Sequence, residues 1–284
     1  MVQSLTELIR HRVERLPSEA GDVLRWAAVL GHSFDVGRLG ELMALDLGRL
    51  LLALELLERH ALLRTPGGAT PGTYEFTHEV VRRAVYSDLS QPRRRLMHLR
   101  VAERLGRAEA AETVAADLAH HAALAGESAL AARACVHAGR LFLRQFANAE
   151  AWAAARRGRR HAAEVEEPER TALLLELLQV ELQARRPADF AGAAAELEAL
   201  AERALDQGDA EHARLGFHML SYLRWEEGDL SDAQRHMLRA EFVSRAGDER
   251  AQVVAMAEAA RCLVLLERDL PRAEALALEA SARS

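Results

Sequence analysis

The sequence predicts an all-α fold in two parts: a small helical domain closed by a short β-hairpin, and a stack of helical hairpins after it. Alanine, leucine and arginine dominate, and lysine is absent, so all 37 basic residues are arginine. These residues favour helix over strand. The apolar period changes from strand-like to helical within Tyr74–Leu89. In the second half, a pattern of small residues returns at a regular interval, which is typical of helical repeats.

The composition limits the classes of protein. A chain of 284 residues that is 50% hydrophobic can form one large or two modest domains. The net charge of −6 gives no reason to expect a general nucleic-acid or membrane binder. A signal peptide is not evident, and no apolar run reaches the ~20 residues of a membrane helix, so we expect a cytoplasmic protein. Cys135 and Cys262 are expected to be reduced core thiols.

Four helices are predicted before the hairpin. The first ends at Pro17, which suits the first turn of the second helix, and the second ends at Gly31. Asp35 and Asp46 are placed to cap the third and fourth helices. The apolar stripe of the fourth helix is expected to be buried. It consists of Leu47, Leu50, Leu51, Leu54 and Leu57.

The hairpin is predicted from the apolar run Ala61–Leu63, the Gly/Pro-rich loop Pro66–Gly72 and the alternating residues Tyr74 and Phe76. Helices followed by a two-stranded hairpin indicate a winged-helix domain. We assign it to residues 1–90, with the loop as the tip of the wing.

DNA binding by this domain is not favoured. The element that would enter the major groove is the Asp46–His60 helix, where Arg49 and Arg59 are offset by Asp46, Glu55 and Glu58. Residues 1–110 hold 16 Arg and 14 Asp plus Glu, a net charge of +2. Phosphate binding needs a concentrated basic face. A packing or regulatory role is therefore preferred, with DNA binding kept as an alternative.

Residues 91–284 are predicted to form tetratricopeptide-like repeats in an α-α superhelix. Ala151, Ala193, Ala233 and Ala273 recur at spacings of 42, 40 and 40 residues. These spacings exceed the 34 residues of the standard repeat, so longer helices are expected. In the clearest unit, Phe217, Leu220, Ser221, Ala233, Met237 and Ala240 occupy the packing positions. Gly139 and Gly158 also fall in the pattern, and the final helix suggests truncation at the C-terminus.

The first helix of this unit is expected to carry the binding face of the stack. The candidate partner-binding residues are Leu215, His218, Tyr222, Trp225 and Glu226. An aromatic pair beside a charge suits capture of a peptide or small ligand. The alternative is that Tyr222 and Trp225 only pack on the neighbouring repeat.

Four segments of the chain resemble one protein family. They are LPSEAGDVLRWAAVLGHSFD, LLLALELLERHALLR, YEFTHEVVRRAVYSDL and RRRLMHLRVAERL. They look like the region after the ATPase core in bacterial STAND-type signal-transduction ATPases, which include LuxR-type and MalT-like regulators, antibiotic-pathway transcriptional regulators and ATPase-linked cyclases. The resemblance implies a regulatory region in which the winged helix, packed on the ATPase domain, switches with nucleotide state. The repeats would then sense an inducer, peptide or protein.

The same resemblance gives His78 a role. In the wider class a Met-His-Asp motif places a histidine against the phosphates of bound ADP, and Thr77-His78-Glu79 occupies a similar strand-to-helix position. An imidazole N–H at the start of a helix can donate to a phosphate. Threonine and glutamate depart from the motif. The alternative is that His78 caps its own helix.

The chain itself is not expected to be an enzyme. A P-loop requires the lysine of GxxxxGK[ST], and this chain has none. His120-His121 beside Asp117 lacks the spacing of a metal site and is interpreted as one core and one exposed histidine. We expect no metal and no cofactor in this chain, with ATP or ADP belonging to a parent protein. A free-standing repeat scaffold for protein–protein interaction is the second hypothesis.

Overall fold

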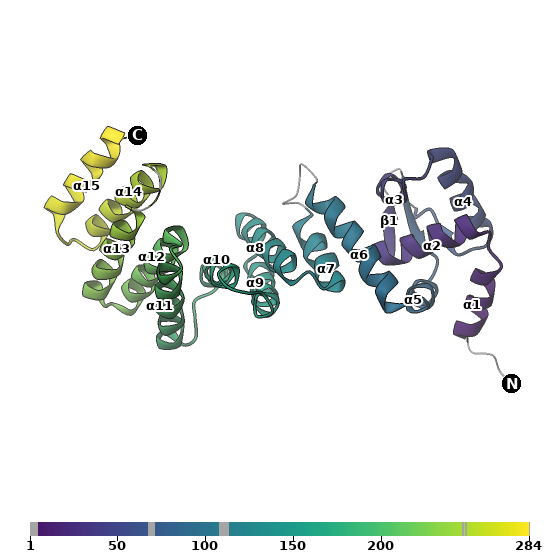
Figure 1. Cartoon of the computed structure of the whole chain (residues 1–284), viewed down its shortest axis with the longest axis horizontal. Helices are drawn as coiled ribbons and strands as arrows, with labels where there is room; N and C mark the ends of the chain where they lie inside the picture. Colours follow the sequence, from purple (N-terminus) through teal and green to yellow (C-terminus); the bar gives the residue numbers. More distant parts are fainter. Residues whose placement is uncertain (1–4, 68–71, 108–113, 246, 248, 284) are drawn as a thin grey trace. The chain divides into compact units, whose positions relative to one another are not determined.

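The computed structural model describes residues 5–67, 72–107, 114–245, 247 and 249–283. The chain forms two compact units, Met1–Glu127 and Ser128–Ser284. Among the described residues both units are mainly helical, and a small three-stranded sheet lies in the first unit (Figure 1). The predicted helical fold with a small sheet is therefore confirmed. None of the described helices is long and apolar enough to cross a membrane.

The first unit begins with four helices, as predicted. Its elements are α1 (Leu5–Glu14), α2 (Ser18–Leu30), β1 (Ser33–Asp35), α3 (Val36–Met43), α4 (Leu47–Arg59), β2 (Leu63–Arg64), β3 (Thr73–Phe76), α5 (Glu79–Ser87), α6 (Gln91–Gly106) and α7 (Ala115–Ala125). The side chain of Asp35 accepts a hydrogen bond from the amide of Arg38 at 2.8 Å. Asp46 accepts one from the amide of Gly48 at 2.9 Å. Both predicted N-caps are confirmed.

The sheet has the strand order β1-β3-β2, with both pairs antiparallel. The central strand β3 leads within two residues into α5, which confirms the predicted change from strand to helix at this point. Strand β1 was not predicted, because three residues with one apolar side chain, Phe34, carry no readable period. Residues 68–71 of the predicted wing tip lie outside the described residues.

The buried face of α4 is narrower than predicted. Leu50, Leu54 and Leu57 are fully buried in the core of the first unit. Leu47 and Leu51 are instead 62% and 42% exposed, so their predicted burial was wrong. The helix packs on α2 and β2, and this contact buries only a narrow stripe, which consists of Leu50, Ala53, Leu54 and Leu57. Among the described residues, nothing covers the flank of α4 that carries Leu47 and Leu51.

The helices α6 and α7 belong to the first compact unit. Arg93 on α6 donates to Asp22 on α2 at 3.0 Å, and Arg104 donates to Glu41 on α3 at 2.8 Å. These ion pairs attach α6 to the helices before the sheet. The sequence places the end of the first domain at residue 90, so the compact units divide later than that boundary. The assignment of α6 and α7 as the first repeat pair stays a prediction.

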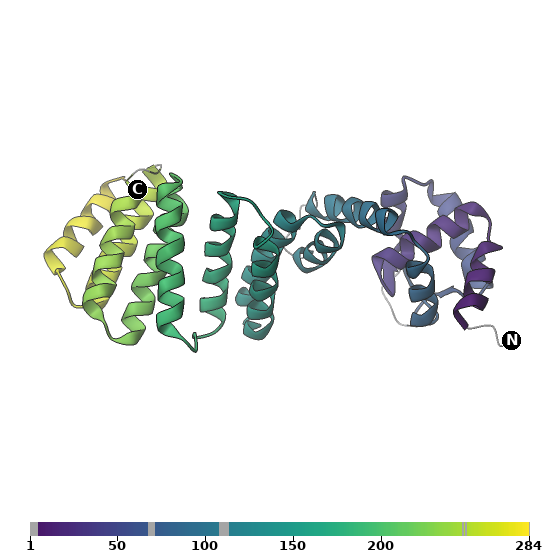
Figure 2. The same cartoon turned by 60° about the horizontal axis from the view of Figure 1, so that its bottom comes forward.

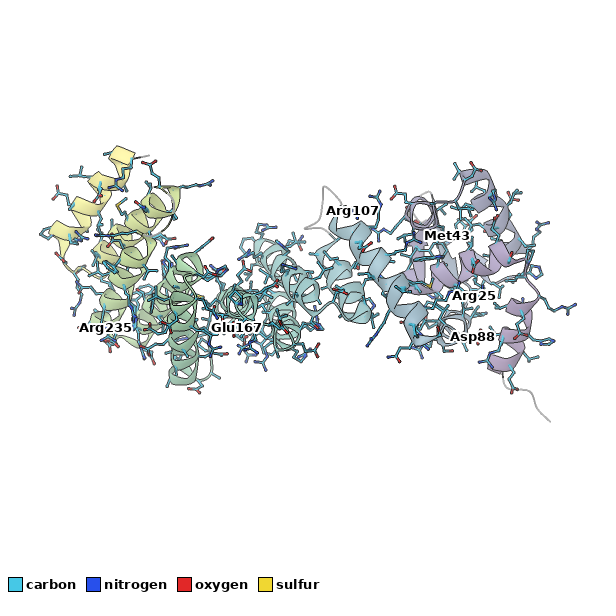
Figure 3. All side chains as sticks on the ribbon, in the orientation of Figure 1. Arg25, Met43, Asp88, Arg107, Glu167 and Arg235 are labelled. Carbon is cyan, nitrogen blue, oxygen red and sulfur yellow. The ribbon has the colours of Figure 1, made fainter. Side chains whose placement is uncertain are left out.

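In the part that the structure describes, the second unit is a stack of four helical hairpins (Figure 2). Their helices are α8 (Ser128–Arg144), α9 (Asn148–Ala162), α10 (Glu169–Ala184), α11 (Phe190–Asp206), α12 (Ala210–Glu227), α13 (Leu230–Ser244), α14 (Glu249–Leu265) and α15 (Leu270–Arg283). Glu167, labelled in Figure 3, stabilises one hairpin. Its carboxylate accepts hydrogen bonds from Thr171 Oγ1 at 2.6 Å and from Gln207 Nε2 at 3.2 Å. It thereby joins the start of α10 to the end of α11.

The repeat pattern accounts for the packing of these hairpins. The six packing positions of the clearest unit are all buried, and so are Ala151 and Ala273. In the second hairpin the predicted Ala193 is only partly buried, and the next residue, Ala194, is fully buried instead. Gly228 ends α12 with a φ of 88°, a conformation that favours glycine.

Candidate functional site

A cleft of about 470 Å³ runs across the first helices of three successive hairpins, α10, α12 and α14. Its volume lies within the range of known ligand pockets, about 300–1,000 Å³. Six of the residues that line it carry polar or charged groups: Gln179, Gln183, His218, Tyr222, Glu226 and Arg261. Apolar side chains, Leu182 and Met219 among them, complete the walls. The face of α12 that the sequence assigned to binding therefore lines a cleft.

Three side chains of α12 line up along the centre of the cleft because of the helical period. His218, Tyr222 and Glu226 are four residues apart, so they lie one above another on the same face of the helix. Gln179 and Gln183 form a second column on α10, again one turn apart. The cleft thus presents two parallel rows of hydrogen-bonding groups that belong to different hairpins.

Tyr222 occupies the middle of this arrangement. Its hydroxyl accepts a hydrogen bond from Arg261 Nη2 on α14 at 2.6 Å. Its ring lies 5.0 Å from the His218 ring and 6.3 Å, edge-on, from the Trp225 ring, measured between centroids. Tyr222 is half-buried against the core of the last hairpins. It therefore both lines the cleft and packs on the neighbouring hairpin.

A half-buried carboxylate lies at one side of the site. Glu258 Oε2 on α14 lies 2.8 Å from Arg214 Nη1 and 3.2 Å from His218 Nδ1. Burial raises the pKa of Glu258, but the contact with His218 and the charge of Arg214 outweigh it and the pKa is lowered overall. The carboxylate is therefore ionised at neutral pH and lies beside the His218 imidazole at the wall of the cleft.

The predicted partner-binding residues separate into two groups. His218, Tyr222 and Glu226 line the cleft. Trp225 is 45% exposed beside it, and Leu215 packs against the core that α10 to α13 share. The sequence did not assign the contributions of α10 and α14. Arg261 gave one signal, because it lies 40 residues after Ser221, where the repeat pattern would place another small residue.

His78 is exposed at the N-cap position of α5, and its side chain makes no capping hydrogen bond. The alternative that His78 caps its own helix is therefore wrong. The adjacent Glu79 accepts hydrogen bonds from Arg82 and lies 3.3 Å from His32 Nδ1. Hydrogen bonding from Arg82 lowers the pKa of Glu79 to about 2. The imidazole of His78 is accessible beside an ionised, arginine-paired carboxylate.

A chain of three polar side chains crosses the first unit at α5, α6 and α7. The Tyr86 hydroxyl lies 2.9 Å from His98 Nε2, and His98 Nδ1 lies 2.8 Å from His121 Nδ1. Burial lowers the pKa of His98 to about 4 and that of His121 to about 3. His121 is buried and His120 exposed, which confirms the predicted division of that pair. The sequence missed His98, because 22 residues separate it from His120 and only folding brings α6 beside α7.

Within the described part of the chain, no group of three or more His, Cys, Asp or Glu side chains is arranged to hold a metal ion. Cys135 and Cys262 are both free, as predicted. Burial raises the pKa of each thiol. Neither residue is therefore placed as a reactive thiolate.

Neither a protein-family model nor a curated protein sequence matches this chain. Among solved structures, the chain is similar to the crystal structure of a Signal Transduction ATPase with Numerous Domains (STAND) protein with a tetratricopeptide repeat sensor, from Pyrococcus horikoshii. The identity is 14% and the TM-score is 0.47. The match covers 100% of this chain and 47% of that chain, so this chain spans about half the length of its neighbour.

Proposed function

We propose that the second unit is a sensor that binds a peptide segment, or an inducer of similar size, in the cleft of α10, α12 and α14. The cleft itself carries the proposal. It has the volume of a ligand pocket, and its amide, imidazole, phenol and charged groups converge from three helices. Gln183 and Glu226 are exposed there and can reach a bound chain. No catalytic step is needed for this role.

A displayed library of random peptides tests the proposal. We expect selection on the wild-type protein to enrich peptides whose affinity falls at least tenfold in the double variant Gln183→Ala/Glu226→Ala, because residues central to an interface each contribute about 1–2 kcal/mol. Isothermal titration calorimetry measures the loss. The matched control is Arg235→Ala on α13, labelled in Figure 3, which does not line the cleft. Failure to enrich any peptide, or equal affinity for both variants, would contradict peptide capture in this cleft.

We further propose that the chain is the regulatory region of a larger STAND-type regulator, with transcription as an output. The order α2-β1-α3-α4-β2-β3 and its antiparallel sheet support a winged-helix assignment for the first part. The exposed flank of α4 carries Leu47, Leu51 and Leu52 instead of a basic surface. Such a flank suits packing of an ATPase domain better than contact with DNA phosphates.

The switch role is tested in the parent protein. We expect the reading frame upstream of Met1 to encode GxxxxGK[ST], and we expect His78→Ala to weaken ADP binding by the parent about tenfold or more. The reason is that a hydrogen bond to a charged phosphate contributes about 1.5–3 kcal/mol. Calorimetry with ADP measures the effect. His11→Ala, an exposed histidine on α1, is the control, and an unchanged ADP affinity in His78→Ala would rule out the sensor role.

A further inference from the structure

The cleft of α10, α12 and α14 holds one charge that the described residues leave unmatched. Arg261 is the arginine that lines the cleft, and Glu226 is the carboxylate that lines it. Glu226 is matched, because its Oε2 lies 3.4 Å from Nε of Arg186. Arg261 forms no ion pair in the described part of the chain, and its guanidinium instead donates to a neutral group, the hydroxyl of Tyr222. The unmatched charge of the cleft is therefore positive.

Glu258, three residues before Arg261 on α14, does not compensate this charge. Its Oε2 already lies 2.8 Å from Arg214 Nη1 and 3.2 Å from His218 Nδ1. The charge of Arg261 is the smallest of the contributions that lower the pKa of Glu258. Glu258 is thus engaged by two other side chains, and the exposed guanidinium of Arg261 is left to face solvent at the cleft.

Tyr222 adds a second donor at the same place. A phenol can accept hydrogen bonds and has one proton to donate. The hydroxyl oxygen of Tyr222 accepts from Arg261 Nη2 at 2.6 Å, so its own proton remains for another acceptor. In the described part of the chain that proton has no other partner. An N–H donor and an O–H donor therefore lie side by side at the wall of the cleft.

The helix α10 supplies further donors to the cleft. Gln179 and Gln183 line it one helical turn apart, and each carboxamide offers an NH₂ group. An ionised carboxylate only accepts hydrogen bonds, and its bonds from arginine are both strong and geometrically specific. A neutral amide or alcohol would leave the charge of Arg261 unmatched. The donors of the cleft therefore favour an anionic, acceptor-only group.

We propose that the ligand of this cleft carries a carboxylate, which Arg261 and Tyr222 bind together. The inference rests on the proposed function of the cleft and adds the chemistry of its ligand. The free C-terminus of a peptide and a small organic acid both present this group, so the experiment has one arm for each source.

Two libraries of short random peptides without Asp or Glu separate carboxylate recognition from peptide capture as such. One library ends in a free carboxylate and the other in a carboxamide, so the two differ only in that group. We expect the wild-type chain to select its tightest ligands from the carboxylate library. Amidation of a selected peptide should weaken its binding about tenfold or more in calorimetry, as the loss of a charge-assisted contact predicts. A panel of small mono- and dicarboxylic acids, titrated in the same way, tests the second source.

Three variants assign the effect to its residues. In Arg261→Gln the carboxylate and carboxamide forms of a peptide should bind with equal affinity. Tyr222→Phe should lower the affinity for the carboxylate form several-fold and leave that for the carboxamide form unchanged. Arg235→Gln on α13, which does not line the cleft, should keep the wild-type difference between the two forms.

The possible outcomes distinguish this inference from the proposed function. Equal affinity of the wild type for both forms would overturn the carboxylate and leave peptide capture standing. If neither library yields a ligand and none of the acids binds, both proposals fail. Binding of a small acid that is lost in Arg261→Gln would support the carboxylate and assign the ligand to a free acid.

Discussion

Replacing Gly158 with valine is expected to destabilise the second unit by about 3 kcal/mol or more. A Cβ at this position would lie 2.4 Å from Leu177 Cδ2 on α10 and 2.8 Å from Cys135 Cβ on α8. Both neighbours are buried, so neither can swing into solvent. Extra methyl groups in a packed core typically cost about 1–3 kcal/mol, and valine adds two beyond the clashing Cβ. Urea unfolding followed by circular dichroism measures the loss as a lower midpoint.

The matched control is Gly106→Ala at the end of α6, where nothing lies within 4 Å of a Cβ. Because alanine favours helix over glycine by up to about 1 kcal/mol, this change should be neutral or stabilising. Hydrogen exchange should place the destabilisation of Gly158→Val in α8, α9 and α10. A wild-type midpoint for Gly158→Val would show that the three helices do not approach as closely as the structure indicates.

The sequence could predict features that depend on local chemistry. Gly139 and Gly158 were assigned to the repeat pattern, and each sits where two helices leave no room for a side chain. Asp35 and Asp46 were predicted as caps, since a cap needs only its own helix. The change of period at Tyr74–Leu89 likewise predicted a strand that leads into a helix. In each case the decisive contact lies within one element or between neighbouring hairpins that repeat.

The features that the sequence could not supply depend on which distant surface covers a residue. Leu47 and Leu51 have the helical period of a buried stripe, but α2 and β2 leave their flank uncovered. The cleft joins Gln183, Tyr222 and Arg261, residues about forty positions apart, through the stacking of three hairpins. The period of a single helix identifies the face but not its neighbours. The row on α12 was therefore predictable from the sequence, whereas the residues that α10 and α14 contribute to the cleft were not.

The first unit is expected to lose stability as the pH falls from about 6.5 toward 4, because of His98 and His121. Burial lowers their pKa values to about 4 and about 3 in the folded state, from 6.5. Below pH 6.5 the unfolded chain binds protons that the folded chain excludes, so folding becomes less favourable; above pH 6.5 neither state gains charge and the effect vanishes. At pH 5 each histidine costs about 2 kcal/mol, from ~1.4 kcal/mol per pKa unit.

The surrounding charges act in the same direction. The charges of His120 and Arg94 lower the pKa of His98 further, and those of His98, His120 and Arg38 do so for His121. Protonation of both rings would also break the His98–His121 contact, since the two facing Nδ1 atoms can share only one proton between them. Acid should therefore loosen the contact of α6 with α7.

Removing the titrating groups should remove the pH dependence. In the triple variant Tyr86→Phe/His98→Leu/His121→Leu every member of the chain becomes apolar, so no buried polar group is left without a partner. In the full wild-type chain we expect the melting temperature of the first unit to fall by more than ten degrees between pH 7 and pH 5. In the triple variant the same melting temperature should change far less. His11→Ala, on the exposed surface of α1, should keep the wild-type slope. Equal slopes for the wild type and the triple variant would mean that other groups control the acid response.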